Sequence, residues 1–257
     1  MIKWVFLDVG NVIFNDDPGM AMVYRKLYAA IREHGDCPSF ERLLEEREEL
    51  ILGQNDGHPP WTLARRYLGE DGALRLREEC LREWADNYSA YNLPLDGIPG
   101  VVRSMARDYS LGIAANQPGA CRDALQELGI LRCFDLIGVS DEMDLRKPSP
   151  EFFTTLVARA GCPPVECVMV GDRIDNDVAP ARSVGMRTVW VRLDLRQKGY
   201  APTERLARLY FESQLRASVS LAEPHTEDEA PDATVRSVRA IPRAIAALDR
   251  KDGSAPR

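Results

Sequence analysis

The sequence is poor in histidine and lacks the patterns that mark several common classes of hydrolase. Three histidines stand among 257 residues, and none belongs to an H-E-x-x-H zinc motif. No G-x-S-x-G segment, which presents the serine nucleophile of many hydrolases, occurs either. The six cysteines are scattered and form no C-x-x-C pair, so we expect free thiols in a reducing compartment. Histidine-dependent hydrolysis, a zinc site and a disulfide framework are therefore not expected.

Long apolar runs and an excess of positive charge are also missing. No segment reaches the roughly 18 apolar residues that a membrane-spanning helix needs. Basic residues number 33 against 40 acidic ones, and the net charge is −7. Because nonspecific binding to nucleic acid needs clustered Lys and Arg, this balance disfavours a nucleic-acid partner. We expect a cytoplasmic monomer or homodimer that binds neither membrane nor nucleic acid, while small phosphorylated molecules stay possible partners.

Short apolar runs alternate with helical patterns over much of the chain. Runs rich in β-forming residues occur at 2–7, 111–115, 136–139, 167–170 and 188–191. Helical patterns separate the later runs, which is typical of βαβ units around a parallel sheet. Since the runs lack polar alternation, we expect the sheet to be covered on both faces. The sequence thus predicts an α/β fold with a Rossmann-like parallel sheet as its core.

A block without expected strands interrupts this alternation. From residue 17 to 92, apolar residues follow helical spacing and glycines and a Pro-Pro pair punctuate them. We therefore expect a discontinuous core, residues 1–16 and 93–257, with an all-helical cap at 17–92 inserted after the first strand. Residues 194–232, where the pattern weakens, are expected to form a C-terminal insertion in that core. A helix at 203–215 is expected to pack on the core or against a second copy.

Polar residues stand just after the expected strands. Asp8 follows the first strand, Asn116 follows 111–115, Lys147 comes after 136–139, and Asp172 and Asp177 follow 167–170. Ligands of parallel α/β sheets bind beyond the carboxyl ends of the strands. Carboxylates gathered there repel each other and favour a divalent cation with hard oxygen ligands, above all Mg²⁺. A cation, a lysine and helix N-termini together form a pocket suited to a phosphoryl group.

Four segments in this order resemble the motifs of the haloacid dehalogenase superfamily of aspartyl-nucleophile hydrolases. They are residues 5–12 with Asp8, residues 113–116, residues 146–148, and residues 170–172 with Asp177. The resemblance covers about residues 1–193, the helical cap included. It implies a Mg²⁺-dependent phosphatase that acts on a small phosphorylated metabolite.

The resemblance also implies roles for single residues. Asp8 is expected to attack phosphorus and to carry a covalent aspartyl-phosphate. Lys147 is expected to neutralise the nucleophile and a phosphoryl oxygen, and to bind the substrate together with Asn116. The expected Mg²⁺ ligands are Asp8, the Gly10 carbonyl and Asp172, with Asp177 supporting the site from close by.

Two positions depart from the usual pattern of the superfamily. Most of its phosphatases carry a second Asp, the general acid and base, where this chain has Gly10. A Thr or Ser hydroxyl usually binds the phosphoryl group where this chain has Ala115. Since positioned acid–base catalysis contributes about 10²–10⁴-fold, we expect a slow enzyme. The backbone N–H of Asn116, at an expected helix N-terminus, is left to hold the phosphate.

The D-x-G-N-V form of the first motif resembles a branch of glucose-1-phosphatase-type sugar phosphatases, so Gly10 alone does not indicate inactivity. Two alternatives stay open. One is a catalytically silent binding or regulatory protein on the same scaffold, which Gly10 and Ala115 favour. The other is a metal-independent haloacid dehalogenase, which also lacks the second Asp but which the Gly171-Asp172 pair disfavours.

Overall fold

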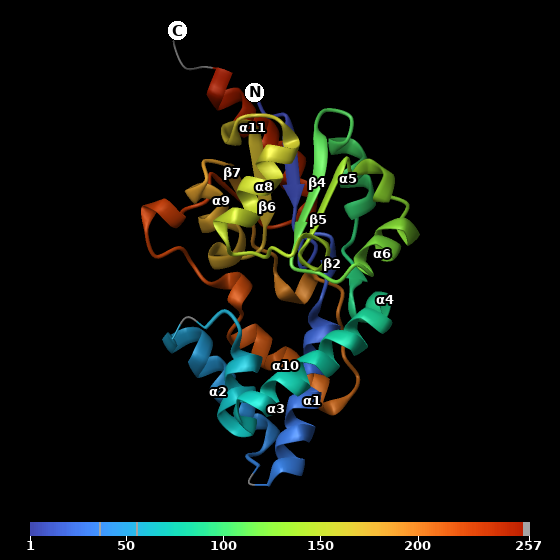
Figure 1. Cartoon of the computed structure of the whole chain (residues 1–257), viewed down its shortest axis with the longest axis vertical. Coiled ribbons are helices and arrows are strands. Elements are labelled where there is room, and N and C mark those ends of the chain that lie inside the picture. Colours follow the sequence, from blue (N-terminus) through green and yellow to red (C-terminus); the bar gives the residue numbers. More distant parts are fainter. Residues whose placement is uncertain (36, 55, 254–257) are drawn as a thin grey trace. The chain divides into compact units, whose positions relative to one another are not determined.

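The computed structural model describes residues 1–35, 37–54 and 56–253 (Figure 1). The chain forms two compact units. The core unit comprises Met1–Asn15, Pro94–Asp194 and Glu223–Arg257, of which residues 254–257 lie outside the described part. The helical unit comprises Asp16–Leu93 and Leu195–Ala222. No helix within the described residues is both long and apolar enough to cross a membrane.

The core unit is built on a six-stranded parallel sheet (Figure 1). Its strands are β1 (Trp4–Leu7), β4 (Ser110–Ala115), β5 (Leu136–Val139), β6 (Cys167–Gly171), β7 (Arg187–Val191) and β8 (Ala233–Val235). They lie in the order β5-β4-β1-β6-β7-β8, and the pairs along the sheet are parallel. The expected parallel sheet is confirmed, and β8 extends it beyond the strands that the sequence predicts.

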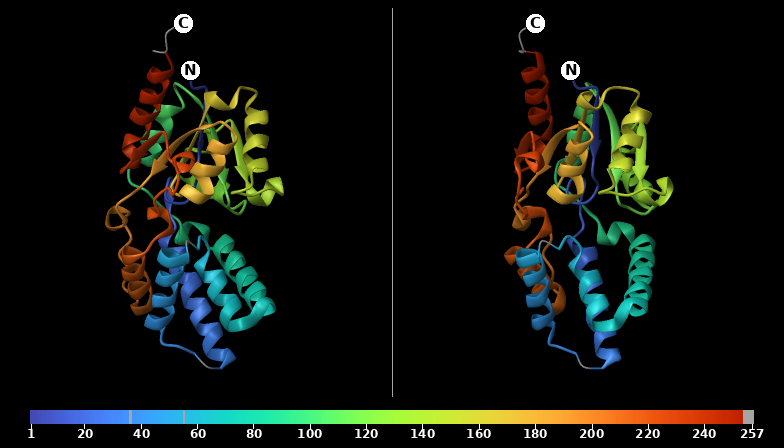
Figure 2. Two further views of the ribbon diagram at one scale, coloured as in Figure 1. Left: turned by 90° about the vertical axis from the view of Figure 1, so that its left-hand side faces the viewer. Right: turned by 60° about the vertical axis from the view of Figure 1, so that its left-hand side comes forward.

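Helices cover both faces of this sheet, with α8 and α11 on opposite sides (Figure 2). The helices of the core unit are α5 (Ile98–Met105), α6 (Cys121–Glu127), α7 (Ser140–Met143), α8 (Pro150–Ala160), α9 (Ala179–Ser183) and α11 (Ile241–Gly253). Local sequence explains the bounds of α8. The Ser149 hydroxyl accepts a hydrogen bond from the Glu151 N–H at its start, and Gly161 ends it with a φ of 66°.

The helical unit contains the helices of the expected cap and one more from later in the chain. They are α1 (Asp17–His34), α2 (Phe40–Gln54), α3 (Pro59–Asp86), α4 (Tyr88–Tyr91) and α10 (Arg205–Arg216). α3 consists of two helical stretches joined at Gly69, which has a φ of 71°. A separate two-stranded sheet stands at the unit boundaries in the sequence. Its strand β2 (Phe14–Asn15) ends the first stretch of the core unit, and β3 (Leu93–Pro94) begins in the helical unit and ends in the core unit.

The segment Leu195–Ala222 corrects the expected domain boundaries. The sequence pattern places residues 93–257 in the core, with 194–232 as an insertion there, but the structure groups Leu195–Ala222 with the helical unit. The ring of Tyr210 in α10 stacks on Tyr24 in α1, with centroids 5.1 Å apart. α10 therefore packs on the helices of the expected cap.

A buried arginine joins α10 to α2 in the same unit. The Arg47 guanidinium lies over the rings of both Tyr24 and Tyr210. It also donates hydrogen bonds to the Ser213 hydroxyl at 3.0 Å and to the Ala217 carbonyl at 2.8 Å. Such a network stabilises the helical unit because the buried charge keeps partners on several sides. The helical unit is thus assembled from two separate stretches of sequence.

Candidate active site

The polar residues that the sequence singles out come from neighbouring strands. Asp8 follows β1, Asn116 follows β4 and Asp172 follows β6, and β1 lies between the other two strands. β1 is paired in parallel along its whole length with both neighbours. The three residues therefore emerge together at the carboxyl edge of the sheet, where ligands of such folds bind.

Three buried carboxylates meet at this edge. Oxygens of Asp8, Asp172 and Asp177 lie within 4.8 Å of one another, and these residues are 8%, 4% and 0% exposed. The chain turns back after β6 in a π-helical turn, Ile174–Val178, which contains Asp177. A glycine is required at position 171, because a Cβ there would collide with the side chain of Asp177. The result is a compact set of oxygen ligands of the kind that divalent cations prefer.

Lys147 is buried inside this cluster. Its Nζ lies 2.9 Å from Asp8 Oδ1 and 2.5 Å from Asp177 Oδ1. Burial acts to lower the pKa of the ammonium, but the attraction of the two carboxylates outweighs it and the pKa is raised. Burial raises the pKa of Asp8 to about 6, with Lys147 acting against the rise and Asp177 adding to it. Lys147 is therefore charged at neutral pH and stabilises the ionised form of Asp8.

The side chain of Asn116 holds the backbone of Lys147. Its Oδ1 accepts a hydrogen bond from the Lys147 N–H, and its Nδ2 donates one to the Lys147 carbonyl, both at 2.9 Å. The expectation that Asn116 lies at a helix N-terminus is wrong, because the next helix, α6, begins only at Cys121. The structure shows that the Asn116 side chain fixes the backbone of Lys147. The sequence pattern did not indicate this contact.

Asn11 is a second polar residue at this edge to which sequence reasoning gave no role. Its Nδ2 donates a hydrogen bond to Asp172 Oδ2 at 2.9 Å. The two residues are 161 positions apart, so spacing within the first motif gives no hint of this contact. The sequence offered one indication of this role: within the first motif, the amide of Asn11 directly follows Gly10, where the second carboxylate is missing.

The two departures from the family pattern lie close to the acidic cluster. Gly10 is buried two residues after Asp8 and forms an isolated bridge with Phe14. Ala115 is the last residue of β4 and is fully buried. Neither side chain offers a proton donor or acceptor. Position 10 therefore lacks the carboxyl group of a general acid, and position 115 lacks a hydroxyl for the phosphoryl group, as the sequence indicates.

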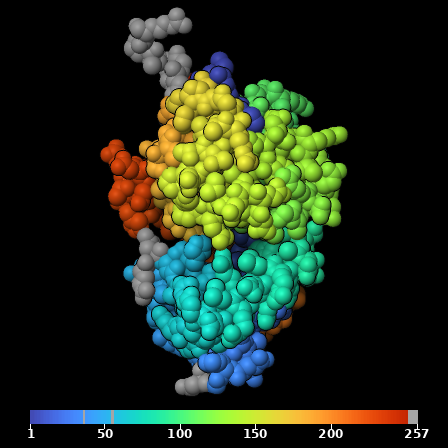
Figure 3. Space-filling model, in the orientation of Figure 1, coloured from blue at the N-terminus to red at the C-terminus, as the bar shows by residue number. Residues whose placement is uncertain are grey.

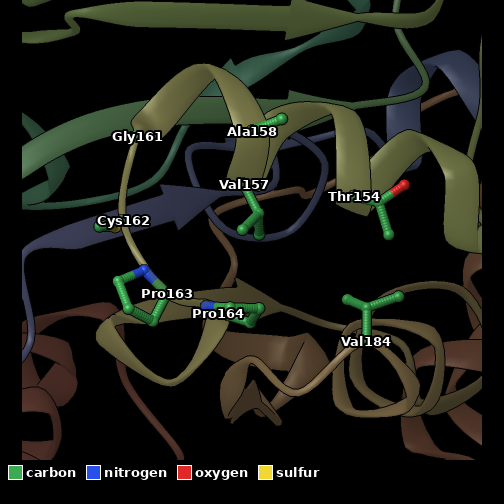
Figure 4. A pocket seen from close by; sticks show the side chains of 8 residues that line it. All are labelled: Thr154, Val157, Ala158, Gly161, Cys162, Pro163, Pro164 and Val184. Atoms are coloured by element: carbon green, nitrogen blue, oxygen red, sulfur yellow. The ribbon is translucent and has the colours of Figure 1, made fainter.

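An apolar pocket lies at the opposite end of β6 from Asp172 (Figure 4). Its volume is about 390 Å³, and Val157 of α8, Pro163, Pro164 and Val184 are among its lining residues. α8 lies at the surface of the core unit in the space-filling view (Figure 3). Because the Pro163-Pro164 segment precedes β6 and Asp172 follows it, this pocket is separate from the acidic cluster.

Comparisons with known proteins place this geometry in context. The family described as "haloacid dehalogenase-like hydrolase" matches residues 2–185. A glyceraldehyde 3-phosphate phosphatase from Methanopyrus kandleri is 30% identical over 197 residues, which cover 75% of this chain and 84% of that protein.

Two solved structures resemble the chain at lower identity. A HAD phosphatase from Thermococcus onnurineus is 24% identical with a TM-score of 0.57, covering 95% of this chain and 98% of the other. A 2-haloacid dehalogenase from Pseudomonas syringae is 22% identical with a TM-score of 0.55, covering 96% and 99%. These two likenesses concern the fold alone, because one fold supports different chemistries.

Proposed function

The chain belongs to the haloacid dehalogenase-like hydrolase family and is a phosphoric monoester hydrolase, and we propose that it acts on a small phosphorylated metabolite through an aspartyl-phosphate on Asp8. The observation that carries this proposal is the Lys147 ammonium, 2.9 Å from Asp8 Oδ1, within a cluster of three buried carboxylates. A carboxylate held ionised by a buried cation is prepared to act as a nucleophile.

The acidic cluster fits a divalent cation, and we assign Mg²⁺ to it. Three carboxylates face the ammonium of Lys147, and the nearby Arg173 guanidinium is paired with a fourth carboxylate, that of Asp175, which leaves an excess of negative charge at the site. The Oδ1 atom of Asn11 is also buried and has no hydrogen-bond donor among the described residues. A hydrated cation supplies both the positive charge and a donor. The residues that would hold it are Asp8, Asp172 and the Gly10 carbonyl, with Asp177 as support.

The residues of the chain carry out two displacements at phosphorus. The Asp8 carboxylate forms a bond to phosphorus while the bond from phosphorus to the substrate's alcohol oxygen breaks. Water then attacks phosphorus, the bond to Asp8 breaks, and inorganic phosphate leaves with the carboxylate restored. Lys147 neutralises negative charge on Asp8 and on a phosphoryl oxygen in both displacements. When bound, Mg²⁺ draws charge from the phosphoryl group and lowers its repulsion with the nucleophile.

Gly10 and Ala115 set the expected rate. With glycine at position 10, the departing alcohol takes its proton from water rather than from a positioned carboxylic acid, which forgoes about 10²–10⁴-fold in rate. Ala115 offers no hydroxyl to the phosphoryl group. The proposed enzyme is therefore slow, most of all with a substrate whose alcohol needs a proton to leave.

A phosphorylated sugar is the substrate class that we favour. The curated relative from Methanopyrus kandleri is named for a phosphorylated triose, and the D-x-G-N-V form of the first motif resembles a branch of sugar phosphatases. Both observations support a small sugar phosphate over a nucleotide or a phosphoprotein.

Phosphate release by the purified protein tests this function. We expect turnover of p-nitrophenyl phosphate and of members of a panel of sugar, nucleotide and organic-acid phosphates, abolished by EDTA and restored by Mg²⁺. Chloride release from 2-chloropropionate in the presence of EDTA would instead identify a dehalogenase. A ligand bound tightly but never hydrolysed would identify a binding protein, the alternative that Gly10 and Ala115 favour.

A further inference from the structure

Asn11 has an unusual backbone conformation beside the nucleophile. Its φ is 52°, and among the described residues that are not glycine only Asp144, at 53°, shares such a positive value. Its N–H donates a hydrogen bond to the Phe14 carbonyl at 2.6 Å, which fixes the tight turn after β1. Glycine is the residue that such a conformation favours most, and asparagine is tolerated. The turn alone therefore does not call for an amide side chain.

The amide of Asn11 has a fixed direction. A carboxylate oxygen can only accept, so the NH₂ group is the one that faces Asp172 Oδ2, at 2.9 Å. The Oδ1 atom on the other side of the same amide is buried and finds no donor within the described part of the chain. Burying an acceptor without a donor is unfavourable. The burial of Oδ1 is explained if a hydrogen-bond donor reaches this atom when a hydrated cation binds in the site.

We propose that Asn11 is a positioning residue for the divalent cation, an inference that rests on the proposed function. Its NH₂ group orients the Asp172 carboxylate, and its Oδ1 accepts a hydrogen bond from the hydration shell of the cation. Groups that orient metal ligands in this way typically contribute about 10–100-fold to metal affinity. Most phosphatases of the superfamily carry a second Asp at the position of Gly10. In this chain the amide of the next residue, Asn11, supports the cation site but does not replace the missing acid.

The variant Asn11→Gly separates this role from a purely structural one. Glycine keeps the left-handed turn and removes the amide, so folding is maintained while the hydrogen bond to Asp172 and the proposed one from the hydration shell are lost. The matched control is Asp144→Gly, which puts glycine at the other described non-glycine residue with a positive φ, an exposed one. Far-ultraviolet circular dichroism and thermal unfolding in EDTA check that both variants fold.

Isothermal titration calorimetry of Mg²⁺ into the substrate-free proteins measures the Kd for Mg²⁺, which is the decisive readout. We expect the Kd for Mg²⁺ to rise about 10–100-fold in Asn11→Gly and to stay at the wild-type value in Asp144→Gly. Turnover of p-nitrophenyl phosphate should show the same shift in Mg²⁺ requirement, with most of kcat recovered at saturating Mg²⁺. A wild-type Kd in Asn11→Gly overturns the inference while leaving the proposed function intact. Wild-type protein that binds no Mg²⁺ overturns both.

Discussion

Two hydrogen bonds of 2.9 Å tie the side chain of Asn116 to the backbone of Lys147. One donor and one acceptor on each side make this pair reciprocal, so it fixes the lysine backbone in both position and orientation. The same lysine places its ammonium between Asp8 and Asp177. The end of β4 thus controls where the positive charge of the site lies.

Replacing Asn116 by alanine tests this relationship. Both hydrogen bonds are lost, so we expect a loss of about 1–3 kcal/mol in the free energy of unfolding and, because the ammonium shifts, a fall in kcat/KM of up to about 100-fold. Urea denaturation and turnover of p-nitrophenyl phosphate measure the two effects. Arg122→Ala, which breaks an exposed ion pair with Glu142, serves as the control with little change. Wild-type kcat/KM in Asn116→Ala would contradict the positioning role.

Gly171→Ala tests the close packing of Asp177. The added Cβ collides with the Asp177 side chain, so the carboxylate must move away from Lys147 and the other acids. We expect a destabilisation of about 1–3 kcal/mol together with weaker Mg²⁺ binding by calorimetry. Gly100→Ala is the control, because a Cβ at that position meets nothing within 4 Å. Equal Mg²⁺ affinity in the two variants would show that Asp177 does not support the cation site.

The raised pKa of Asp8 predicts how stability depends on pH. Burial raises this pKa from 3.8 to about 6, so the folded state holds the proton more tightly than the unfolded chain does. The resulting stabilisation is fully present below about pH 3.8 and is lost as the pH rises through about 6. The amide of Asp8→Asn does not titrate, so this contribution to stability is absent from the variant. Urea denaturation in EDTA measures the free energy of unfolding of both proteins. The free energy of the wild type relative to the variant should fall as the pH rises from about 4 to about 6. A difference that does not change with pH would contradict the raised pKa of Asp8.

The same titration predicts competition between protons and Mg²⁺. The Asp8 carboxylate must be ionised to bind the cation, so the affinity for Mg²⁺ should weaken progressively below about pH 6. Calorimetric titrations at a series of pH values on both sides of this pKa measure it. An affinity that stays constant over this range would remove Asp8 from the ligand set.

Gly10→Asp is expected to add a general acid. Gly10 is not among the glycines of the described chain that have a positive φ, so a side chain is sterically allowed by the backbone there. We expect little gain with p-nitrophenyl phosphate, whose leaving group needs no proton, and up to about 10²–10⁴-fold gain with an alkyl phosphate. The ratio of kcat/KM for the two substrates is the measurement. An unchanged ratio would show that proton donation does not limit the enzyme.

The sequence predicts the bounds of helices and strands well where local chemistry determines structure. Ser149, Pro150 and Gly161 mark the bounds of α8, as their capping chemistry predicts, and Gly69 marks the break in α3. Apolar runs locate β1, β4, β5, β6 and β7. In contrast, β8 is three residues long and lies at the sheet edge, so its pattern is too short to indicate a strand.

Contacts between distant residues explain what could not be predicted. The helical pattern of α10 is visible in the sequence, but nothing in it specifies Tyr24 as the partner of Tyr210. The contacts of Asn116 with Lys147 and of Asn11 with Asp172 likewise join residues that are 31 and 161 positions apart. The residue types at the carboxyl edge are therefore predictable, whereas the hydrogen bonds that position them require the fold.

Turnover of the Asp8→Asn variant tests the central claim most directly. The amide keeps the shape of Asp8 but is a poor nucleophile, so we predict that kcat/KM with p-nitrophenyl phosphate and saturating Mg²⁺ falls at least about a thousandfold. Circular dichroism and mass spectrometry confirm that the variant is folded and that the introduced amide has not deamidated. Turnover equal to that of the wild type would contradict the aspartyl-phosphate mechanism.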